Sequence, residues 1–303
     1  MRRILIGPST FGSLRATPLD RLRDKGFDVV PNPFGRTIAE PELLALLPGV
    51  TGLIAGLEPL TRSVLERSEL RVISRCGAGM SNVDVEAARQ LGIAVRNTPD
   101  APTSGVAELA IAAMLALLRE IVPVNAALHA GQWIRPPGAQ LEGRTVVIIG
   151  FGRIGRRIAD LLLAFGARVI AVDPDVDRVD PPIELATLAS ALPRADIVAV
   201  HASGEATILG SAELRLLKRT ALVLNGGRGG LVDEAALCDA LESGRVAGAW
   251  IDVFRDEPYR GPLTKYPQAL LTPHIGSLTA ECRGRMEMEA VENLLDALAA
   301  TER

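Results

Sequence analysis

One stretch in the middle of the chain restricts the fold more than any other: RTVVIIGFGRIGRRIADLLLAFGARVIAVDPD, residues 144–175. It begins with a run rich in Val and Ile, passes through three glycines, and continues as a helical pattern followed by a second Val- and Ile-rich run. Gly150, Gly152 and Gly155 have the G-x-G-x-x-G spacing that opens a βαβ unit. Two strands joined by a helix in this way lie parallel, so the stretch predicts an α/β fold.

The same glycines fit the needs of a bound dinucleotide. Gly150 permits a tight turn, Gly152 lets the backbone approach a pyrophosphate, and Gly155 lets helix and strand pack closely. The helix N-terminus offers amide donors to the phosphates. Asp173 follows about 20 residues after the motif, where a carboxylate accepts hydrogen bonds from ribose hydroxyls and repels a 2′-phosphate. The pattern therefore favours NAD over NADP, and Arg178 is the nearby residue that argues in the other direction. The residues expected to bind NAD in the turn are Gly150, Gly152, Arg153, Ile154 and Gly155. The alternative is that the glycines serve only a tight turn.

Apolar runs and helical patterns alternate along nearly the whole chain. The first series is RRILIG, FDVVP, VTGLIAG, RVISRCG and IAVRN, and the second starts at RTVVIIG and ends at LLTPHIG. Each series predicts a doubly wound parallel sheet. The segment GVAELAIAAMLALLRE, residues 105–120, is apolar nearly all round and predicts a helix buried between layers or domains. Residues 281–300 have helical spacing and are expected to return to the first domain.

The totals agree with a folded protein of two domains. The chain has 303 residues, 48% of them hydrophobic, and a formal net charge of -3. Without a basic run, nucleic acid is not an expected partner. The longest apolar stretch is too short to span a membrane, and the start has no signal-peptide pattern, so no membrane association and a cytoplasmic location are expected. Cys76, Cys238 and Cys282 have no metal-ligand spacing, which favours reduced thiols and no metal site.

Three segments of the second half carry the groups that hydride transfer to a carbonyl requires. They are LNGGRGGLVDEAAL with Arg228, WIDVFRDEP with Asp252 and Glu257, and LLTPHIGS with His274. A histidine can handle the proton on oxygen, and a cation can polarise the carbonyl and hold a carboxylate. Because ligands of such sheets bind at the carboxyl ends of strands, the three segments are expected to converge there, with Glu257 orienting the ring of His274.

Several ordered motifs together resemble the D-2-hydroxyacid dehydrogenase family, especially its phosphoglycerate dehydrogenase-like branch. They are SRCGAGMSNVDVEAARQLGIAVRNTP, the glycine fingerprint, NGGRGGLVDEAAL, DVFRDEP and TPHIGS. The resemblance covers nearly the whole chain. It implies an NAD-binding Rossmann domain, residues 100–280, inserted in a smaller flavodoxin-like substrate domain, residues 1–99 plus 281–303. It also implies an active site in the cleft between the domains, and a homodimer formed through the cofactor domains.

The resemblance also assigns roles to single residues. Arg228 binds the carboxylate and keto oxygen of a 2-hydroxy or 2-oxo acid, His274 is the acid/base, and Glu257 pairs with His274. Asp252 contacts the nicotinamide carboxamide, and the alternative is a satisfied polar residue at a strand end. The loop of Cys76, Gly77, Ala78 and Gly79 receives the substrate carboxylate, in keeping with the anion-binding nest that successive amides form.

Some positions depart from the family pattern. The chain has HASGEAT without the usual proline, so His201 is either a cofactor-side residue or a structural imidazole. Gly226 and Gly227 are expected to loosen the loop that supports Arg228. Arg75 beside the Gly77 loop is a candidate for binding a phosphate or second carboxylate, as in 3-phosphoglycerate, or forms a surface salt bridge. The sequence ends at Arg303, so regulatory domains found in some relatives are not expected.

Two alternatives to a hydroxyacid dehydrogenase stay open at this point. One is a non-catalytic NAD(H)-sensing module that resembles corepressors of this fold. The intact set Arg228, Glu257 and His274 favours an enzyme. The other is a different oxidation, of formate or phosphite, but the residue expected to pair with His274 is Glu257 rather than a neutral Gln. The identity of the acid cannot be read from the sequence.

Overall fold

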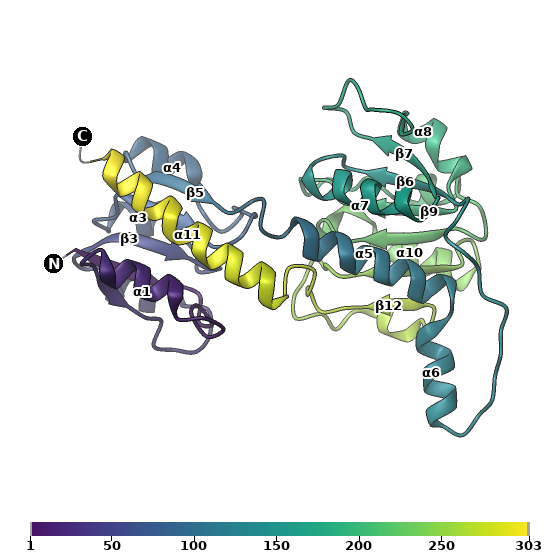
Figure 1. Cartoon of the computed structure of the whole chain (residues 1–303), viewed down its shortest axis with the longest axis horizontal. Helices are drawn as coiled ribbons and strands as arrows, with labels where there is room; N and C mark the ends of the chain where they lie inside the picture. Colours follow the sequence, from purple (N-terminus) through teal and green to yellow (C-terminus); the bar gives the residue numbers. More distant parts are fainter. Residues whose placement is uncertain (1, 302–303) are drawn as a thin grey trace. The chain divides into compact units, whose positions relative to one another are not determined.

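Two parallel sheets, each covered by helices on both faces, make up the computed structural model, which describes residues 2–301 (Figure 1). The chain divides into two compact units. Unit one comprises Met1–Pro102 and Thr279–Arg303, and unit two comprises Thr103–Leu278. Residues 1, 302 and 303 of the expected substrate domain lie outside the described residues. The predicted fold class, two parallel-sheet α/β domains, is confirmed.

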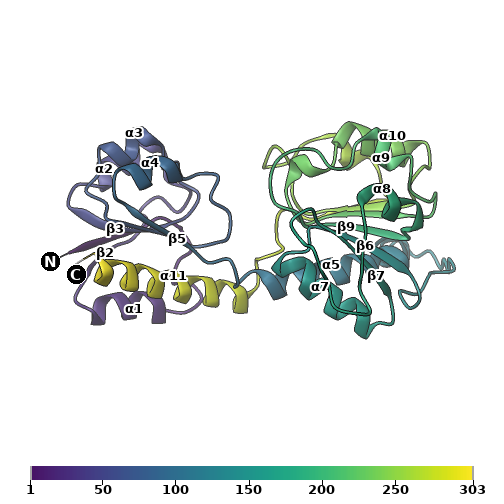
Figure 2. The same cartoon turned by 90° about the horizontal axis from the view of Figure 1, so that it is seen from above.

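Unit one contains a five-stranded parallel sheet with strand order β2-β1-β3-β4-β5, the flavodoxin-like order. Its strands are β1 (Arg3–Ile6), β2 (Asp28–Val30), β3 (Val50–Ala55), β4 (Val72–Arg75) and β5 (Ala94–Asn97). Its helices are α1 (Thr17–Asp24), α2 (Glu40–Leu46), α3 (Arg62–Glu66), α4 (Val85–Gln90) and α11 (Ala280–Ala300). Helices α1 and α11 cover one face, and α2, α3 and α4 cover the other (Figure 2).

Unit two contains a seven-stranded parallel sheet with order β12-β11-β10-β9-β6-β7-β8. If β6 is numbered as the first strand, the order from β8 to β11 is 3-2-1-4-5-6, which is the Rossmann order, and β12 is one further strand beside β11. Its strands are β6 (Thr145–Ile149), β7 (Arg168–Val172), β8 (Glu184–Leu185), β9 (Ile197–Val200), β10 (Leu222–Asn225), β11 (Gly248–Ile251) and β12 (Ala269–Leu271). Its α-helices are α5 (Thr103–Leu118), α6 (Ile121–His129), α7 (Arg153–Ala164), α8 (Leu188–Ala191), α9 (Ser211–Leu214) and α10 (Glu234–Glu242). Three short 3-10 helices are η1 (Leu192–Arg194), η2 (Gly229–Leu231) and η3 (Pro262–Lys265).

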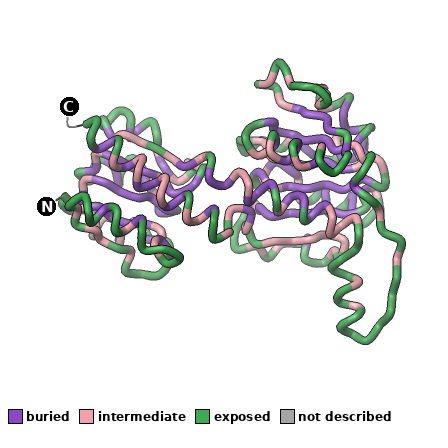
Figure 3. Tube along the Cα trace, viewed as in Figure 1, coloured by how far each residue is buried: buried purple, intermediate pink, exposed green. Residues whose placement is uncertain are grey.

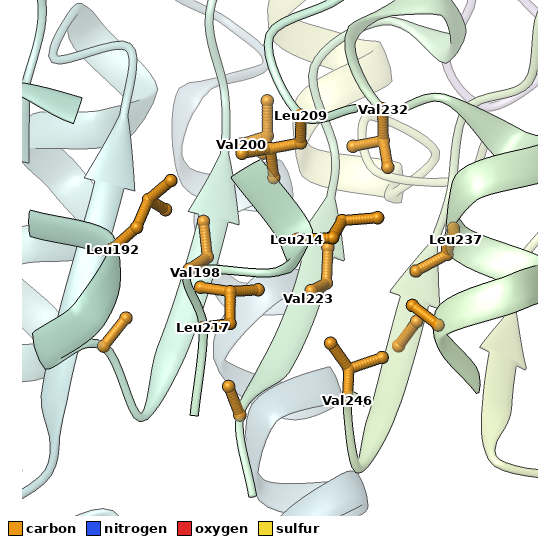
Figure 4. Close-up of a cluster of buried hydrophobic side chains, with 14 of the residues drawn as sticks. Leu192, Val198, Val200, Leu209, Leu214, Leu217, Val223, Val232, Leu237 and Val246 are labelled. Carbon is orange, nitrogen blue, oxygen red and sulfur yellow. The ribbon is translucent and has the colours of Figure 1, made fainter. Parts of the chain in front are cut away.

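Apolar side chains fill both faces of the second sheet, because parallel strands covered on both sides must be apolar throughout. On one face, Val198 and Val223 of the strands pack with Leu192, Leu214 and Leu237 (Figure 4). On the other face, α5 and α7 pack against the sheet around the fully buried Trp250. The helix expected over residues 105–120 is therefore an interior helix of unit two.

Three elements were not predicted from the sequence. Helix α1 has a polar sequence, TPLDRLRD, with only two buried residues, and β8 has only two residues. Helix α6 has no buried residue, so its apolar side chains follow no inward-facing stripe. Figure 3 shows α6 and the segment after it as mostly exposed. Among the described residues, no helix is both long and apolar enough to cross a membrane.

Candidate active site

The predicted reactive groups lie at the carboxyl ends of three neighbouring strands. β10, β11 and β12 are adjacent and parallel, with Asn225 opposite Ile251 and Ile251 opposite Leu271. Arg228 follows β10 by three residues, and His274 follows β12 by the same number. The sheet therefore brings segments more than 40 residues apart to one edge, as the spacing predicted.

His274 and Glu257 form a direct pair. The ring Nδ1 of His274 lies 2.9 Å from Oε2 and 3.1 Å from Oε1 of Glu257. Both side chains are partly exposed, at 52% and 38%. Because Nδ1 is held by the carboxylate, Nε2 is the ring nitrogen that remains for proton transfer to a ligand.

The backbone of His274 is held in an unusual conformation, with φ at 54°. Left-handed values are uncommon for residues other than glycine and require support from the surroundings. The His274 N–H donates to the carbonyl oxygens of Asp252 (2.8 Å) and Thr272 (3.0 Å). These bonds fix the direction in which the imidazole leaves the chain.

Asp252 is buried and binds the segment that carries His274. Its Oδ1 accepts hydrogen bonds from Thr272 Oγ1 (2.5 Å) and the Ile275 N–H (2.9 Å), and its Oδ2 accepts from the Gly276 N–H (2.9 Å). Trp250 Nε1 in turn donates to Thr272 Oγ1. The sequence predicted a cofactor contact for Asp252, with a hydrogen-bonded polar residue at a strand end as the alternative, but it did not show that the bonds would hold residues 272–276.

The loop after β10 presents Arg228 to solvent. The buried Asn225 closes this loop by donating from Nδ2 to the Arg228 carbonyl (2.9 Å) and accepting at Oδ1 from the Gly227 N–H (3.2 Å). The guanidinium Nη1 of Arg228 donates to the Gly227 carbonyl. Asn225 was not among the predicted site residues, although its position at the end of a buried strand is a usable signal.

The expected loosening by Gly226 and Gly227 is wrong. A Cβ at Gly226 would lie 2.7 Å from His201 Cε1, and one at Gly227 would lie 3.0 Å from the Ala202 carbonyl oxygen. Glycine is therefore needed here for close packing, which holds the loop rather than loosening it. Both ring nitrogens of His201 are buried without a hydrogen-bond partner, and burial lowers the pKa of His201 to about 4.

The glycine-rich turn has the form that a dinucleotide requires. Gly150 has φ of 92°, and a Cβ there would collide with the backbone of Ala202. A Cβ at Gly155 would collide with the Gly150 carbonyl oxygen, whereas the space around Gly152 at the start of α7 is open. Asp173 accepts from the Phe151 N–H (2.6 Å) and the Asp175 N–H (2.9 Å). Its two oxygens have four acceptor sites, so acceptor capacity remains for ribose hydroxyls.

The loop of residues 75–79 lies in unit one, at the carboxyl end of β4. The Gly77 N–H donates to Thr98 Oγ1 (2.7 Å), and Asn97 Nδ2 donates to the Ala78 carbonyl (2.8 Å). Gly77 has φ of 140°, and the Arg75 guanidinium lies where its Cβ would be. The Gly77 amide is thus already used by the side chain of Thr98.

The three cysteines are buried and unpaired, as expected for reduced thiols. Burial raises the pKa of Cys76 to about 12. Its thiol is therefore not a nucleophile at neutral pH, although its residue belongs to the loop described above.

Comparison with known proteins adds independent information. Residues 111–276 match the family described as "D-isomer specific 2-hydroxyacid dehydrogenase, NAD binding domain". The chain is 36% identical over 272 residues to the hydroxypyruvate reductase of Thermotoga maritima, covering 86% of this chain and 89% of the relative. It is 38% identical over 269 residues to the D-3-phosphoglycerate dehydrogenase of Mycobacterium tuberculosis, covering 85% of this chain and 51% of the relative.

The chain thus spans about half the length of the D-3-phosphoglycerate dehydrogenase that it matches. Among solved structures, a protein from Thermus thermophilus superposes with a TM-score of 0.89 at 36% sequence identity. That likeness covers 98% of this chain and 97% of the other.

Proposed function

Because the chain belongs to the D-isomer specific 2-hydroxyacid dehydrogenase family, we propose that Arg228, Glu257 and His274 are its catalytic residues. The chain is an NAD-dependent oxidoreductase that interconverts a D-2-hydroxy acid and its 2-oxo acid. A catalytic protein is favoured over the NAD(H)-sensing alternative. The observation that carries the proposed roles is the His274–Glu257 pair at the strand edge that also presents Arg228.

NAD, when bound at the glycine turn, supplies or accepts the hydride. In the reducing direction, protonated His274 gives its Nε2 proton to the carbonyl oxygen of the substrate, and Glu257 stabilises the imidazolium beforehand. Arg228 stabilises the negative charge that develops on that oxygen. In the oxidising direction, neutral His274 takes the hydroxyl proton. Asp252 keeps residues 272–276 in place in both directions of the reaction. It is also a candidate contact of the nicotinamide carboxamide. His201 is a candidate residue on the cofactor side.

We propose that the amides of Ala78 and Gly79 in unit one bind the substrate carboxylate. In this proposal the predicted substrate domain, residues 1–99 plus 281–303, binds the acid. The predicted NAD domain, residues 100–280, binds the cofactor. Arg75 contributes positive charge beside Gly77. The cytoplasm is the proposed location, because three thiols remain unpaired and the cofactor is a soluble dinucleotide.

We propose a short 2-oxo acid as substrate, in the size range of glyoxylate and hydroxypyruvate. The similarity to a hydroxypyruvate reductase along 89% of its length supports this choice. The alternative, 3-phosphohydroxypyruvate, is the substrate class suggested by the relatives named D-3-phosphoglycerate dehydrogenase, which extend well beyond the matched region.

The test is an NADH-consumption assay over a panel of 2-oxo acids that includes both classes. Arg228→Ala and His274→Ala are each expected to lower kcat/KM by about a thousandfold while NADH still binds. Arg260→Ala, which removes an exposed arginine three residues after Glu257, serves as the control and should have little effect. Tight NADH binding without turnover of any acid would instead support the NAD(H)-sensing alternative.

We further propose that the protein is a homodimer and that α6 with the segment after it forms the contact. Apolar side chains are exposed here at Ile121 (50%), Val122 (54%), Leu128 (58%), Trp133 (79%) and Ile134 (48%). Exposed apolar side chains gathered in this way are typical of a protein interface. The apolar helix at residues 106–118, whose sequence is compatible with such a contact, packs against the sheet of unit two.

A further inference from the structure

A carboxylate is buried in unit one, and only one of its two oxygens accepts a hydrogen bond. Glu58 follows β3 and is completely inaccessible to solvent. Its Oε1 accepts a hydrogen bond from the Gly56 N–H (2.8 Å), whereas its Oε2 has no hydrogen-bond partner. Burying an ionised carboxylate is costly unless it is paired, so such a residue is rare without a role.

The backbone forms a cradle for this carboxylate. A Cβ at Gly7 would overlap Glu58 Oε1, and a Cβ at Gly56 would lie 2.9 Å from Oε2. These glycines follow β1 and β3, which are paired strands. Any side chain at either position would displace the carboxylate. The cradle therefore fixes a carboxyl group at the carboxyl end of the sheet.

The cradle adjoins the loop of residues 75–79. The Cys76 N–H donates to the Ala55 carbonyl (2.9 Å), so the two chain segments leave the sheet side by side. Asn82 ties them together by donating from Nδ2 to the carbonyls of Gly56 (3.2 Å) and Glu58 (2.8 Å). The carboxylate thus belongs to the same end of the sheet as the amides of the loop.

Charge links Glu58 to the loop as well. Burial raises the pKa of Glu58, and the positive charge of Arg75 opposes this effect. The Arg75 guanidinium lies against Gly77 and donates to the Cys76 carbonyl. When Glu58 is ionised, its charge offsets that of Arg75, so these two groups together do not offer the net positive charge that a phosphate needs.

On the premise of the proposed function, with the loop binding the substrate carboxylate, we propose that Glu58 is a specificity-determining residue that restricts the enzyme to acids without a second negative charge. Hydroxypyruvate and glyoxylate meet this condition, and 3-phosphohydroxypyruvate does not. The effect acts through space, because the carboxylate is fixed, poorly hydrated and at the same end of the sheet as the anion-binding amides. This reverses the expectation that Arg75 favours a phosphorylated acid.

The experiment compares kcat/KM for hydroxypyruvate and 3-phosphohydroxypyruvate with NADH at pH 8, well above the ordinary range of carboxyl pKa values. The wild-type protein is expected to prefer hydroxypyruvate by roughly a hundredfold or more, and Glu58→Gln is expected to narrow this preference by about tenfold or more. Glu69→Gln removes one negative charge from an exposed position of unit one and should keep the wild-type ratio.

A wild-type preference for the phosphorylated acid overturns the proposal without any variant, and so does an unchanged ratio in folded Glu58→Gln. Thermal unfolding establishes whether that variant folds, and Glu58→Ala replaces it if it does not. Binding of D-glycerate and D-3-phosphoglycerate to the NAD-loaded protein, measured by calorimetry, needs no turnover. If catalysis is absent, the proposed function fails, yet a preference for D-glycerate that Glu58→Gln reduces still supports the role of Glu58. The role of Glu58 is overturned if the two acids bind equally well, if D-3-phosphoglycerate binds more tightly, or if neither acid binds.

Discussion

The Nδ1 atom of His274 lies within 3.1 Å of both carboxylate oxygens of Glu257, although 17 residues separate them in the chain. Glu257→Gln keeps the size of the side chain but removes the charge that stabilises the imidazolium. We expect kcat to fall by roughly tenfold to a hundredfold, with NADH affinity retained. Steady-state kinetics with the best 2-oxo acid measures this. Asp256→Asn, an exposed neighbour, is the matched control, and equal kcat values for the two variants would contradict the pairing role.

Asp252→Asn should reduce both stability and turnover. The asparagine amide cannot accept all the bonds that Asp252 accepts from Thr272 and from the N–H groups of Ile275 and Gly276. A buried donor without its acceptor costs about 1–3 kcal/mol, and the misplaced segment moves His274. Chemical denaturation gives the stability change, and kcat gives the effect on His274. A variant with wild-type stability would show that these hydrogen bonds are not needed.

Gly226→Ala should destabilise the protein by about 1–3 kcal/mol, because the new methyl group would lie 2.7 Å from His201 Cε1 and 3.2 Å from Trp250. A double-mutant cycle tests the cause. In a His201→Ala background, the added methyl group enters the space of the missing ring, and its cost should fall by about 1 kcal/mol or more. Additive effects of the two substitutions would locate the strain elsewhere.

His201 should make the protein sensitive to acid. Burial lowers the pKa of His201 from 6.5 to about 4, so between these values the unfolded chain binds more protons than the folded protein. Stability therefore rises with pH across this window and is lost as pH falls through it, by about 3 kcal/mol in total. Urea unfolding of wild type and His201→Gln from pH 4 to pH 7 should give curves that diverge toward acid. Parallel curves would show that His201 does not titrate in this way.

Trp133→Glu together with Leu128→Glu should convert the proposed homodimer to monomers, because both exposed apolar side chains belong to the surface formed by α6 and the segment after it. Sedimentation velocity of the wild-type protein first establishes the dimer. Leu216→Glu changes an apolar side chain that is also exposed but follows α9 rather than α6, and it should leave the mass unchanged. A monomeric wild type, or a dimer that survives the double substitution, would exclude this surface as the contact.

The sequence allowed prediction of those parts of the molecule that depend on local periodicity. Val- and Ile-rich runs between helical patterns gave both sheets, and the rule that ligands gather at strand ends brought Arg228, Glu257 and His274 to one edge. Helix α6 could not be found in this way, because its apolar side chains face outward and do not report a core.

The remaining features that were not predicted depend on contacts between segments that are distant in the sequence. Gly226 looked like a flexible position until its packing against His201, 25 residues earlier, was seen. Glu58 was not singled out from the sequence, since the cradle that buries it requires Gly7, about 50 residues before it in the chain. In both cases the local sequence contains the residue but not the neighbour that decides its environment.

Helix α11 packs on the first sheet, with Met286 and Leu294 in one core cluster with Ile4, Ile54 and Val72. The strands of that sheet are synthesised before the helix, with all of unit two between them. During translation, one apolar face of the sheet thus has no α11 cover until about residue 300 has left the ribosome. The nascent N-terminal segment must therefore remain soluble while unit two folds.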